Sequence, residues 1–313
     1  MNGSAFSLDF PRAWTGALAS GILKQQAEDF YVEELLAPEL SESGEHVWLC
    51  LEKIGQNTEY VAEKLAAFAN VKVMDIGYSG LKDRWAQTRQ WFSVYLGNKP
   101  EPDWSSMSLE GVRLLNYGRQ QKKLRRGEHR ANKFSIRIRN FEATGDTEML
   151  LQQVQQHGFP NYFGPQRFGL NGANLTRGLR YFNGQIKASR SQRSFYLSAA
   201  RSYLFNLNLG VVIEHQRWLG DSLGGPLYGD ERDDIEGLSE LEREILNRHP
   251  VFAAAFHKNR LKLERRPYLI VPQELTWALE KQELLLTFVL PSGCFATSLL
   301  AELLDYEVGL GVS

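Results

Sequence analysis

The chain of 313 residues contains little cysteine and no long apolar run. Its two cysteines, Cys50 and Cys294, lie far apart and outside any CxxC pair. Their scarcity excludes a disulfide scaffold and a cysteine-based zinc site, and it fits a reducing compartment. No run approaches the roughly 18 apolar residues of a membrane-spanning helix. The segment from Met1 to Arg12 lacks a basic start followed by an apolar stretch, so we expect no secretory signal, no membrane partner and a cytoplasmic location.

Several motifs of cofactor and metal chemistry are also missing. The sequence has neither a GxGxxG loop nor a Walker A loop, and its six histidines form no HExxH or other close ligand pair. The segment from Gly77 to Gly80 is similar to a nucleophile elbow but lacks the second spacer before the last glycine. We therefore expect no metal site, no cofactor and no hydrolase serine.

The formal net charge of −1 conceals two opposite stretches. Residues 221–244 carry nine acids against two arginines, whereas residues 113–139 carry ten cations against the single acid Glu128. The ten cations, called the basic stripe below, are Arg113, Arg119, Lys122, Lys123, Arg125, Arg126, Arg130, Lys133, Arg137 and Arg139. Such a stripe attracts a phosphate backbone through local counterion release. The alternative is a solvated loop between two strands.

The length is typical of one large or two ordinary domains. Runs of β-formers and spacings of three to four residues predict an order of elements along the chain. The predicted strands cover 46–54, 90–96, 112–117, 134–139 and 284–290, and the predicted helices cover 57–70, 146–157, 174–182, 194–218, 238–247 and 297–304. This order indicates a sheet-based domain at both ends of the chain with a more helical segment between them.

The pentapeptide from Gly80 to Arg84 places Asp83 between Lys82 and Arg84. If this segment is extended, side-chain alternation turns both cations away from Asp83, so that they can touch phosphates while Asp83 faces a cavity. The nearby cations would keep Asp83 ionised, as a nucleophile requires. The alternative is a turn with a local ion pair.

Seven segments of the sequence resemble the tRNA pseudouridine synthase D family, in the family's order. They are EDFYVEE at 28–34, GEH at 44–46 with Lys53 and Asn57-Thr58, GLKDR at 80–84 with Thr88 and Gln90-Trp91-Phe92, Asn132-Lys133-Phe134, NYFGPQRFG at 161–169, LSAARS at 197–202 with Leu204-Phe205-Asn206, and LPSGCFATS at 290–298. Members of this family isomerise uridine 13 in certain tRNAs. The resemblance covers nearly the whole chain.

The resemblance assigns the role of catalytic nucleophile to Asp83 and pairs it with Lys24, which would orient the carboxylate and hold it ionised. For Lys24, the alternative is an exposed strand lysine. Isomerisation breaks the glycosidic C–N bond, rotates the uracil and rejoins it through carbon. Attack at C6, attack at C1′ and proton removal all remain open. None of them requires a cofactor.

The resemblance further implies that the target base is flipped out of the RNA to reach Asp83. It assigns Phe30, Phe134 and Phe295 to the aromatic walls around the flipped base and Asn132 to the hydrogen bonds with uracil. For Phe134, the alternating pattern of its strand leaves a core role open. The chain departs from the family at two positions, since Trp85 replaces a usual histidine and Ala301 an arginine.

The candidate RNA-binding residues are Lys82, Arg84, Lys122, Lys123, Arg125, Arg126 and Arg167. Arg167 belongs to a mixture of aromatic residues and arginine at 161–168, which suits either RNA contact or packing between domains.

We predict an α+β pseudouridine synthase fold with an antiparallel-rich mixed sheet, flanking helices and an inserted α/β domain. The catalytic domain would comprise residues 1–157 and 270–313, and the insertion residues 158–269. We expect a monomer that isomerises uridine to pseudouridine in tRNA, at position 13 of tRNA(Glu)-type substrates, with no obligate protein partner. A non-catalytic RNA-binding protein and an RNA-cleaving or glycosidase-like hydrolase are the alternatives, although no second catalytic carboxylate is evident for the hydrolase.

Overall fold

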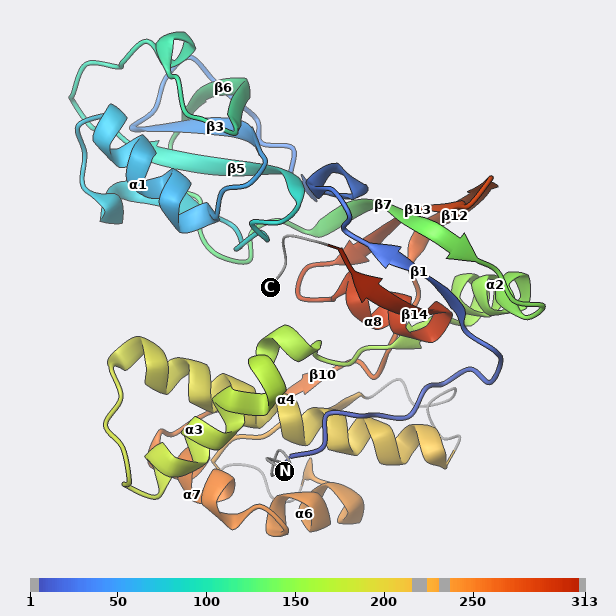
Figure 1. The fold of residues 1–313 in the computed structure, drawn as a ribbon. Coiled ribbons are helices and arrows are strands. Elements are labelled where there is room, and N and C mark those ends of the chain that lie inside the picture. The colour runs from blue at the N-terminus through green and yellow to red at the C-terminus, as the bar shows by residue number, and fades with distance from the viewer. Residues whose placement is uncertain (1–5, 216–223, 231–236, 310–313) are drawn as a thin grey trace. The chain divides into compact units, whose positions relative to one another are not determined.

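The computed structural model describes residues 6–215, 224–230 and 237–309 (Figure 1). The chain divides into two compact units, each assembled from segments that are distant in sequence. The sheet unit comprises residues 18–147, 272–293 and 304–313, and the helical unit comprises residues 1–17, 148–271 and 294–303. The predicted domains group residues 1–17, 148–157, 270–271 and 294–303 with the sheet instead, and those boundaries stay a prediction.

The sheet unit is built on a single mixed sheet, with ten strands in the described part of the chain. The main path runs β12 (Gln273–Glu280), β13 (Glu283–Pro291), β7 (Ala131–Glu142), β2 (Phe30–Leu35), β5 (Gln87–Tyr95), β3 (His46–Lys53) and β6 (Val112–Gln120). Off this path lie β1 (Ala19–Leu23), β14 (Leu304–Val308) and β4 (Ile76–Tyr78). Only the β1–β14 and β2–β5 pairings of the described strands are parallel. The predicted α+β class with an antiparallel-rich mixed sheet is confirmed.

Helix α1 (Thr58–Phe68) packs on the sheet unit through one apolar face. Its Val61 and Leu65 join Leu49 and Leu51 of β3 in a fully buried cluster. The helix begins where the sequence predicts, because the side chain of Asn57 accepts a hydrogen bond of 2.7 Å from the backbone of Tyr60. This cap fixes the chain direction immediately after β3, beside the candidate site.

Helices dominate the helical unit. They are α2 (Thr147–His157, of which all but the first residue belong here), α3 (Ala173–Phe182), α4 (Arg190–Glu214), α6 (Glu240–Asn247), α7 (Pro250–Lys258) and α8 (Ala296–Leu303). Two small antiparallel pairs accompany them, β8 (Phe159–Pro160) with β11 (Leu269–Ile270) and β9 (Gly225–Leu227) with β10 (Glu264–Arg266). Single 3-10 turns occur in both units at Ala27–Asp29, Val73–Asp75, Trp104–Ser106, Pro165–Arg167 and Leu170–Gly172.

Most predicted elements are present, with shifted ends. Helix α4 begins at Arg190 rather than near residue 194, because Ser189 and Gln192 form a reciprocal capping box ahead of the apolar pattern. The predicted end of that helix at 218 and much of the acidic stretch at 221–244 lie outside the described residues. Strand β12 and helix α7 are additional, and β12 exposes most of its side chains, so it lacks the apolar alternation that predicts a strand.

None of the described helices combines the length and apolar character needed to cross a membrane.

Candidate active site

The register of the sheet places three of the predicted site residues on one face. Strand β2 pairs with β7 so that Phe30 faces Ile136, Val32 faces Phe134 and Glu34 faces Asn132. Residues directly opposite each other in a sheet share a face, and so do residues two apart along a strand. Phe30, Phe134 and Asn132 therefore share a face, together with the carboxylate of Glu34, which sequence reasoning did not single out.

Asp83 lies between β4 and β5, in a segment that forms no strand. Its Oδ2 forms an ion pair with Nζ of Lys24, which follows β1 with a left-handed backbone (φ 57°). Its Oδ1 accepts a hydrogen bond of 3.0 Å from the backbone nitrogen of Trp85. The ammonium of Lys24 also lies 4.3 Å from the ring centroid of Phe30. The structure thus brings together the two residues that the resemblance pairs.

The electrostatic surroundings of Asp83 favour its ionised form. Burial alone would raise the pKa of this carboxyl, but the ammonium of Lys24, the hydrogen bonds from Lys24 and Trp85 and the charge of Lys53 outweigh it. The pKa of Asp83 consequently lies below its ordinary value. At neutral pH the site presents a carboxylate whose geometry is set by its partners.

Lys53 anchors the backbone of the same segment from beneath. Its side chain is fully buried, and its Nζ donates hydrogen bonds of 2.9 Å to the carbonyl of Asp83 and 2.7 Å to that of Gln56. Burial, with a smaller effect from Lys82, lowers the pKa of Lys53 to about 8 although the charge of Asp83 opposes this. The sequence alone could have indicated that Lys53 is buried, because it continues the inward-facing register of Leu49 and Leu51 in β3.

Lys82 turns into the sheet unit rather than toward solvent. Its Nζ lies 2.8 Å from Oε1 of Glu34 and donates a 2.9 Å hydrogen bond to Oδ1 of Asn132. The side chain of Lys82 is 8% exposed and that of Glu34 is wholly buried. The expected alternation about Asp83 does not occur, since the segment is not extended as a strand. Lys82 is better placed to hold Asn132 than to contact a phosphate.

The amide of Asn132 has a defined orientation. An ammonium can only donate, so the atom that faces Lys82 is the amide oxygen. The amide nitrogen then lies 3.3 Å from Nε2 of His129, which is also 3.1 Å from Oγ of Ser292. Burial, followed by the charge of Lys82, lowers the pKa of His129. Glu34, His129 and Ser292 complete a polar cluster around Asn132.

The glycine preceding this segment lies close to neighbouring side chains. A Cβ at Gly80 would lie 3.2 Å from Cε1 of His129 and 3.4 Å from Nζ of Lys82. The backbone nitrogen of Lys82 donates a hydrogen bond of 2.9 Å to Oγ1 of Thr58, and that hydroxyl in turn donates a hydrogen bond to the side chain of Gln90. These contacts tie the Asp83 segment to α1 and β5, so its position does not depend on solvent-exposed groups.

The aromatic residues of the sheet unit are mostly packed. Phe30 and Phe134 are each 6% exposed, with their ring centroids 6.2 Å apart in an edge-to-face arrangement, and Phe134 stacks on Phe288 at 5.2 Å. These contacts support the core alternative for Phe134. Phe295 belongs to the helical unit, where its ring centroid lies 6.0 Å from that of Phe163 and 6.0 Å from the guanidinium of Arg167.

Two apolar side chains flank Asp83 at the surface. Leu81 is 52% exposed and Trp85 is 39% exposed. The guanidinium carbon of Arg84 lies 5.1 Å from the centroid of the Trp85 ring. Its Nε donates a hydrogen bond of 2.9 Å to the carbonyl of Gly55. Trp85, which replaces a usual family histidine, thus offers an aromatic surface beside the nucleophile candidate. The second departure, Ala301, lies on the exposed side of α8.

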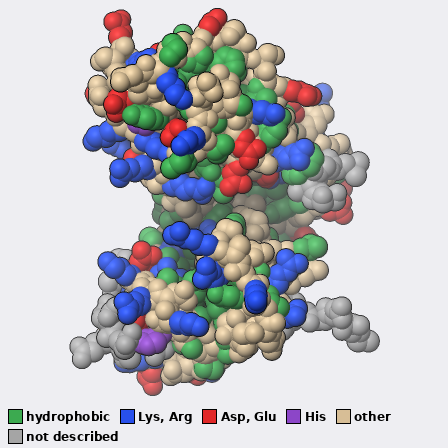
Figure 2. Space-filling model, turned by 90° about the vertical axis from the view of Figure 1, so that its left-hand side faces the viewer, with side chains coloured by type: hydrophobic (Ala, Val, Ile, Leu, Met, Phe, Trp, Pro, Cys, Tyr) green, Lys and Arg blue, Asp and Glu red, His purple; other side chains and the backbone are tan. Residues whose placement is uncertain are grey.

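Much of the basic stripe is committed to contacts within the sheet unit. Four of its cations are paired with carboxylates among the described residues: Arg113 with Glu52, Arg119 with Glu101, Arg137 with Glu283, and Arg139 with Asp29 and Glu283. Lys123 donates to the carbonyl of Met74, and Arg126 donates to the hydroxyl of Tyr78 and stacks on its ring. Lys122, Arg125 and Arg130 are exposed. Figure 2 shows one face of the molecule, on which Lys and Arg side chains are numerous.

No group of three or more His, Cys, Asp or Glu side chains suited to a metal ion occurs in the described ranges. The site offers instead the carboxylates of Asp83 and Glu34, three lysines and an oriented amide on a mixed sheet.

Comparisons with known proteins identify the class to which this fold and site belong. The family model of tRNA pseudouridine synthase D matches residues 13–176 and 220–303. The chain is 39% identical to tRNA pseudouridine synthase D of Haemophilus influenzae (strain PittEE), over 92% of this chain and 94% of the relative. It is 40% identical to that of Pseudomonas entomophila (strain L48), over 94% of both.

A crystal structure from Methanosarcina mazei, described under the same family name, matches with a TM-score of 0.66 at 20% identity and covers 93% of this chain and 95% of that one. At this identity the likeness shows the fold alone.

These findings define an RNA-modifying isomerase, a pseudouridine synthase. The chain belongs to the tRNA pseudouridine synthase D family, and tRNA is the substrate that the family implies. The matches give no support to a non-catalytic RNA-binding protein or a hydrolase.

Proposed function

We propose that the chain converts uridine to pseudouridine at position 13 of tRNA(Glu)-type substrates, with Asp83 as the nucleophile. The observation that carries this proposal is the state of Asp83, a carboxylate paired with Lys24 and held by the backbone nitrogen of Trp85. Its pKa lies below the ordinary value although partial desolvation opposes this, and a carboxylate that must react in its charged form needs such a pKa.

The chemistry requires one reactive carboxylate and no redox input. The N1–C1′ bond of uridine breaks, the uracil rotates, and a C5–C1′ bond forms, after which the C5 proton is lost and N1 is protonated. Asp83 supports this sequence by attack at C6 of the base, by attack at C1′ of the ribose as in retaining glycosidases, or by proton removal. Each route uses the ionised form of Asp83, so each depends on Lys24.

The base reaches Asp83 by flipping out of the RNA helix, and the polar cluster around Asn132 favours a uracil there. Uracil presents alternating acceptors and a donor at O4, N3–H and O2, and a primary amide offers both kinds of group. Lys82 orients the Asn132 amide, so its recognition surface is set before the base arrives. Phe30 and Phe295 are the proposed aromatic walls, and Phe134 would join them only if its ring, which stacks on Phe288, turns an edge to the base.

RNA contact around the nucleophile involves apolar as well as cationic side chains. Removing a base from a stack leaves a gap that apolar residues commonly fill. Leu81 and Trp85, exposed on either side of Asp83, suit that role, and Arg84 stacked on Trp85 adds a cation. Lys122 and Arg125, two exposed members of the basic stripe, are proposed to meet phosphates.

Tritium release from tRNA labelled at C5 of uridine tests the reaction directly. Wild type should release tritium from bulk tRNA, and Asp83→Asn should release none while still binding tRNA. Release that is absent with wild type, or equal in the two proteins, would contradict the proposal.

The target position needs a separate measurement. A tRNA(Glu) transcript should gain one pseudouridine at position 13, and the same transcript with cytidine at that position should release no tritium. Modification elsewhere in both transcripts would contradict the proposed position while leaving the reaction intact.

A further inference from the structure

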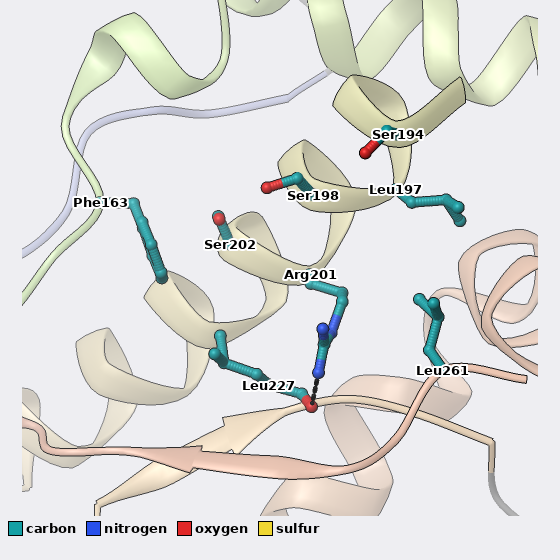
Figure 3. A pocket seen from close by; sticks show the side chains of 8 residues that line it. All are labelled: Phe163, Ser194, Leu197, Ser198, Arg201, Ser202, Leu227 and Leu261. Atoms are coloured by element: carbon teal, nitrogen blue, oxygen red, sulfur yellow. Dashed lines mark hydrogen bonds between the residues drawn. The ribbon is translucent and has the colours of Figure 1, made fainter. Parts of the chain in front are cut away.

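A pocket of about 290 Å³ opens beside α4 in the helical unit (Figure 3). Ser194, Ser198 and Ser202 line it from the helix, and their spacing of four residues places the three hydroxyls along one side. Phe163 and three leucines, Leu197, Leu227 and Leu261, supply apolar walls. None of the residues around Asp83 lines this pocket, so it is a separate feature of the molecule.

Arg201 lies in the pocket lining with part of its donor capacity unused. Figure 3 shows it reaching from α4 to the carbonyl of Leu227, to which Nη2 donates at 2.7 Å. The same nitrogen donates 2.8 Å to the carbonyl of Lys262 and lies 3.4 Å from the exposed carboxylate of Glu264. The buried Nε has no hydrogen-bond partner within the described ranges. Since an unsatisfied buried donor is costly, an acceptor that enters the pocket would be stabilised there.

A second guanidinium adjoins the pocket without a carboxylate partner. Arg167 donates 3.0 Å to Oγ of Ser198, and its guanidinium lies 5.4 Å from the ring centroid of Phe163. It takes part in no ion pair among the residues that the structure describes, and burial lowers its pKa. Arg266 lies 4.2 Å over the same ring. The largely buried guanidinium of Arg167, which has no carboxylate partner among the described residues, favours an anionic ligand, and arginine suits phosphate.

We propose that this pocket binds one nucleotide of the tRNA chain other than the uridine being isomerised. Arg167, Arg201 and the serine hydroxyls would hold the phosphodiester, and Phe163 with the leucines would face the ribose. The described lining offers no amide or carboxylate side chain to read a base edge, so the contact would be independent of sequence. The inference rests on the proposed function, because it takes tRNA as the ligand.

Charge substitutions at Ser194 test the pocket without disturbing its fold, because this residue is exposed on the helix surface. Ser194→Asp should raise the Kd for tRNA by about tenfold or more, the size expected when a hydrogen bond to a charged group is removed. Ser194→Lys should lower the Kd and steepen its dependence on salt. The matched controls are Ala254→Asp and Ala254→Lys, which make the same charge changes at an exposed position of α7 outside the pocket.

Tritium release at saturating tRNA separates this proposal from the proposed function. The Ser194 variants should change KM and leave kcat near the wild-type value, since Asp83 is untouched. Equal tRNA binding by the Ser194 and Ala254 variants, or a change in Kd of the same sign for Asp and Lys at Ser194, would overturn the pocket assignment.

Inorganic phosphate distinguishes a free anion from RNA. Phosphate that stabilises the wild type against thermal unfolding, combined with unchanged tRNA binding in the Ser194 variants, would overturn the RNA assignment in favour of a small-anion site. A wild type that binds tRNA but releases no tritium would instead contradict the proposed function.

Discussion

Two lysines from distant parts of the sequence contact Asp83. Lys24 meets the carboxylate itself, and Lys53 holds the carbonyl of the same residue. Their different contacts follow from their positions. Lys24 follows β1 with a left-handed backbone, whereas Lys53 is buried at the end of β3. Lys24 favours the ionised form of the Asp83 carboxyl, and Lys53 holds the backbone of Asp83 in position.

Replacing Lys24 by methionine should raise the pKa of Asp83, because burial remains while the main favourable charge is removed. The acid limb of the activity profile should then move to higher pH, and kcat/KM on that limb should fall roughly tenfold if the pKa rises by about one. Tritium release measured from acid to neutral pH checks this. Lys24→Arg, which keeps the positive charge, serves as the control. If the activity of wild type, Lys24→Met and Lys24→Arg depends on pH in the same way, the role given to Lys24 is wrong.

Sequence reasoning pointed to the Asp83–Lys24 pair, which the structure brings into contact, but not to the side chains that hold it in place. The GLKD motif identified Asp83, and its resemblance to the family identified Lys24, Phe30 and Asn132. Sequence reasoning assigned no role to Lys53 or Glu34, although each occupies an inward-facing position of a strand whose other inward positions are apolar. A charged side chain at such a position needs a buried partner, but the identity of that partner depends on strand pairing that one sequence does not reveal.

At the scale of elements, the pairing of β2 with β7 creates the buried Glu34–Lys82–Asn132 cluster. Removing one member of a buried ion pair leaves the other charge uncompensated, whereas removing both is far less costly. The cluster therefore serves as a test of whether these charges are needed for stability or for the site.

Glu34→Leu should lower the free energy of unfolding by about 3 kcal/mol or more, and Glu34→Leu combined with Lys82→Met should recover most of that loss. Urea unfolding checks both, with the exposed Glu244–Arg248 pair as control, where the expected change is under about 1 kcal/mol. The double variant should still lose activity, because Asn132 loses its donor. A double variant as unstable as the single one would contradict this explanation.

A second element-level contact joins the N-terminal segment to α8 within the helical unit. The buried carboxyl of Glu302 accepts hydrogen bonds of 3.0 and 3.2 Å from the backbones of Ala13 and Trp14. Burial raises the pKa of Glu302 to about 7, although those bonds and Arg12 oppose the rise. The folded state therefore retains a proton that the unfolded state has already released between its ordinary pKa and 7, so stability falls as pH rises through this interval.

Glu302→Gln keeps an acceptor for both backbone groups but cannot ionise. The variant and wild type should unfold alike near pH 5, and the variant should be more stable by roughly 2 kcal/mol at pH 8. Urea unfolding at the two pH values provides the comparison. If wild type is the more stable protein at pH 8, burial does not control this carboxyl.

The same scale shows why some elements escape prediction. Strands β1 and β14 are five residues long and pair with each other in parallel, and most side chains of β14 are exposed, so their own sequence carries little alternation. Strands β3, β5, β7 and β13 were predicted because buried side chains recur along them. Tertiary pairing, rather than local propensity, forms the short strands.

For the whole molecule, a net charge of −1 says little about RNA affinity. Ion pairs within the sheet unit already neutralise four arginines of the basic stripe, which composition could not reveal. The chain also interleaves its two units, so that short segments near both ends belong to the helical unit. A single sequence contains no marker for such interleaving.

Reversing Lys122 and Arg125 together should weaken tRNA binding and reduce the slope of log Kd against log salt by about 0.7–0.9 for each phosphate that is no longer neutralised. Filter binding at several salt concentrations measures both effects. Lys64→Glu, at an exposed position of α1 outside the stripe, is the control for general charge. If the slope of log Kd against log salt is the same as for wild type, the basic stripe is a solvated loop that does not contact RNA.

The central claim is that Asp83 carries out the chemistry rather than the binding of tRNA. A single-turnover measurement of tritium release, with enzyme in excess over C5-labelled tRNA, tests it most directly because binding no longer limits the rate. Asp83→Asn should react at least about a thousandfold more slowly than wild type, while its Kd for tRNA stays within about twofold. A rate within about tenfold of wild type at saturation would contradict the claim.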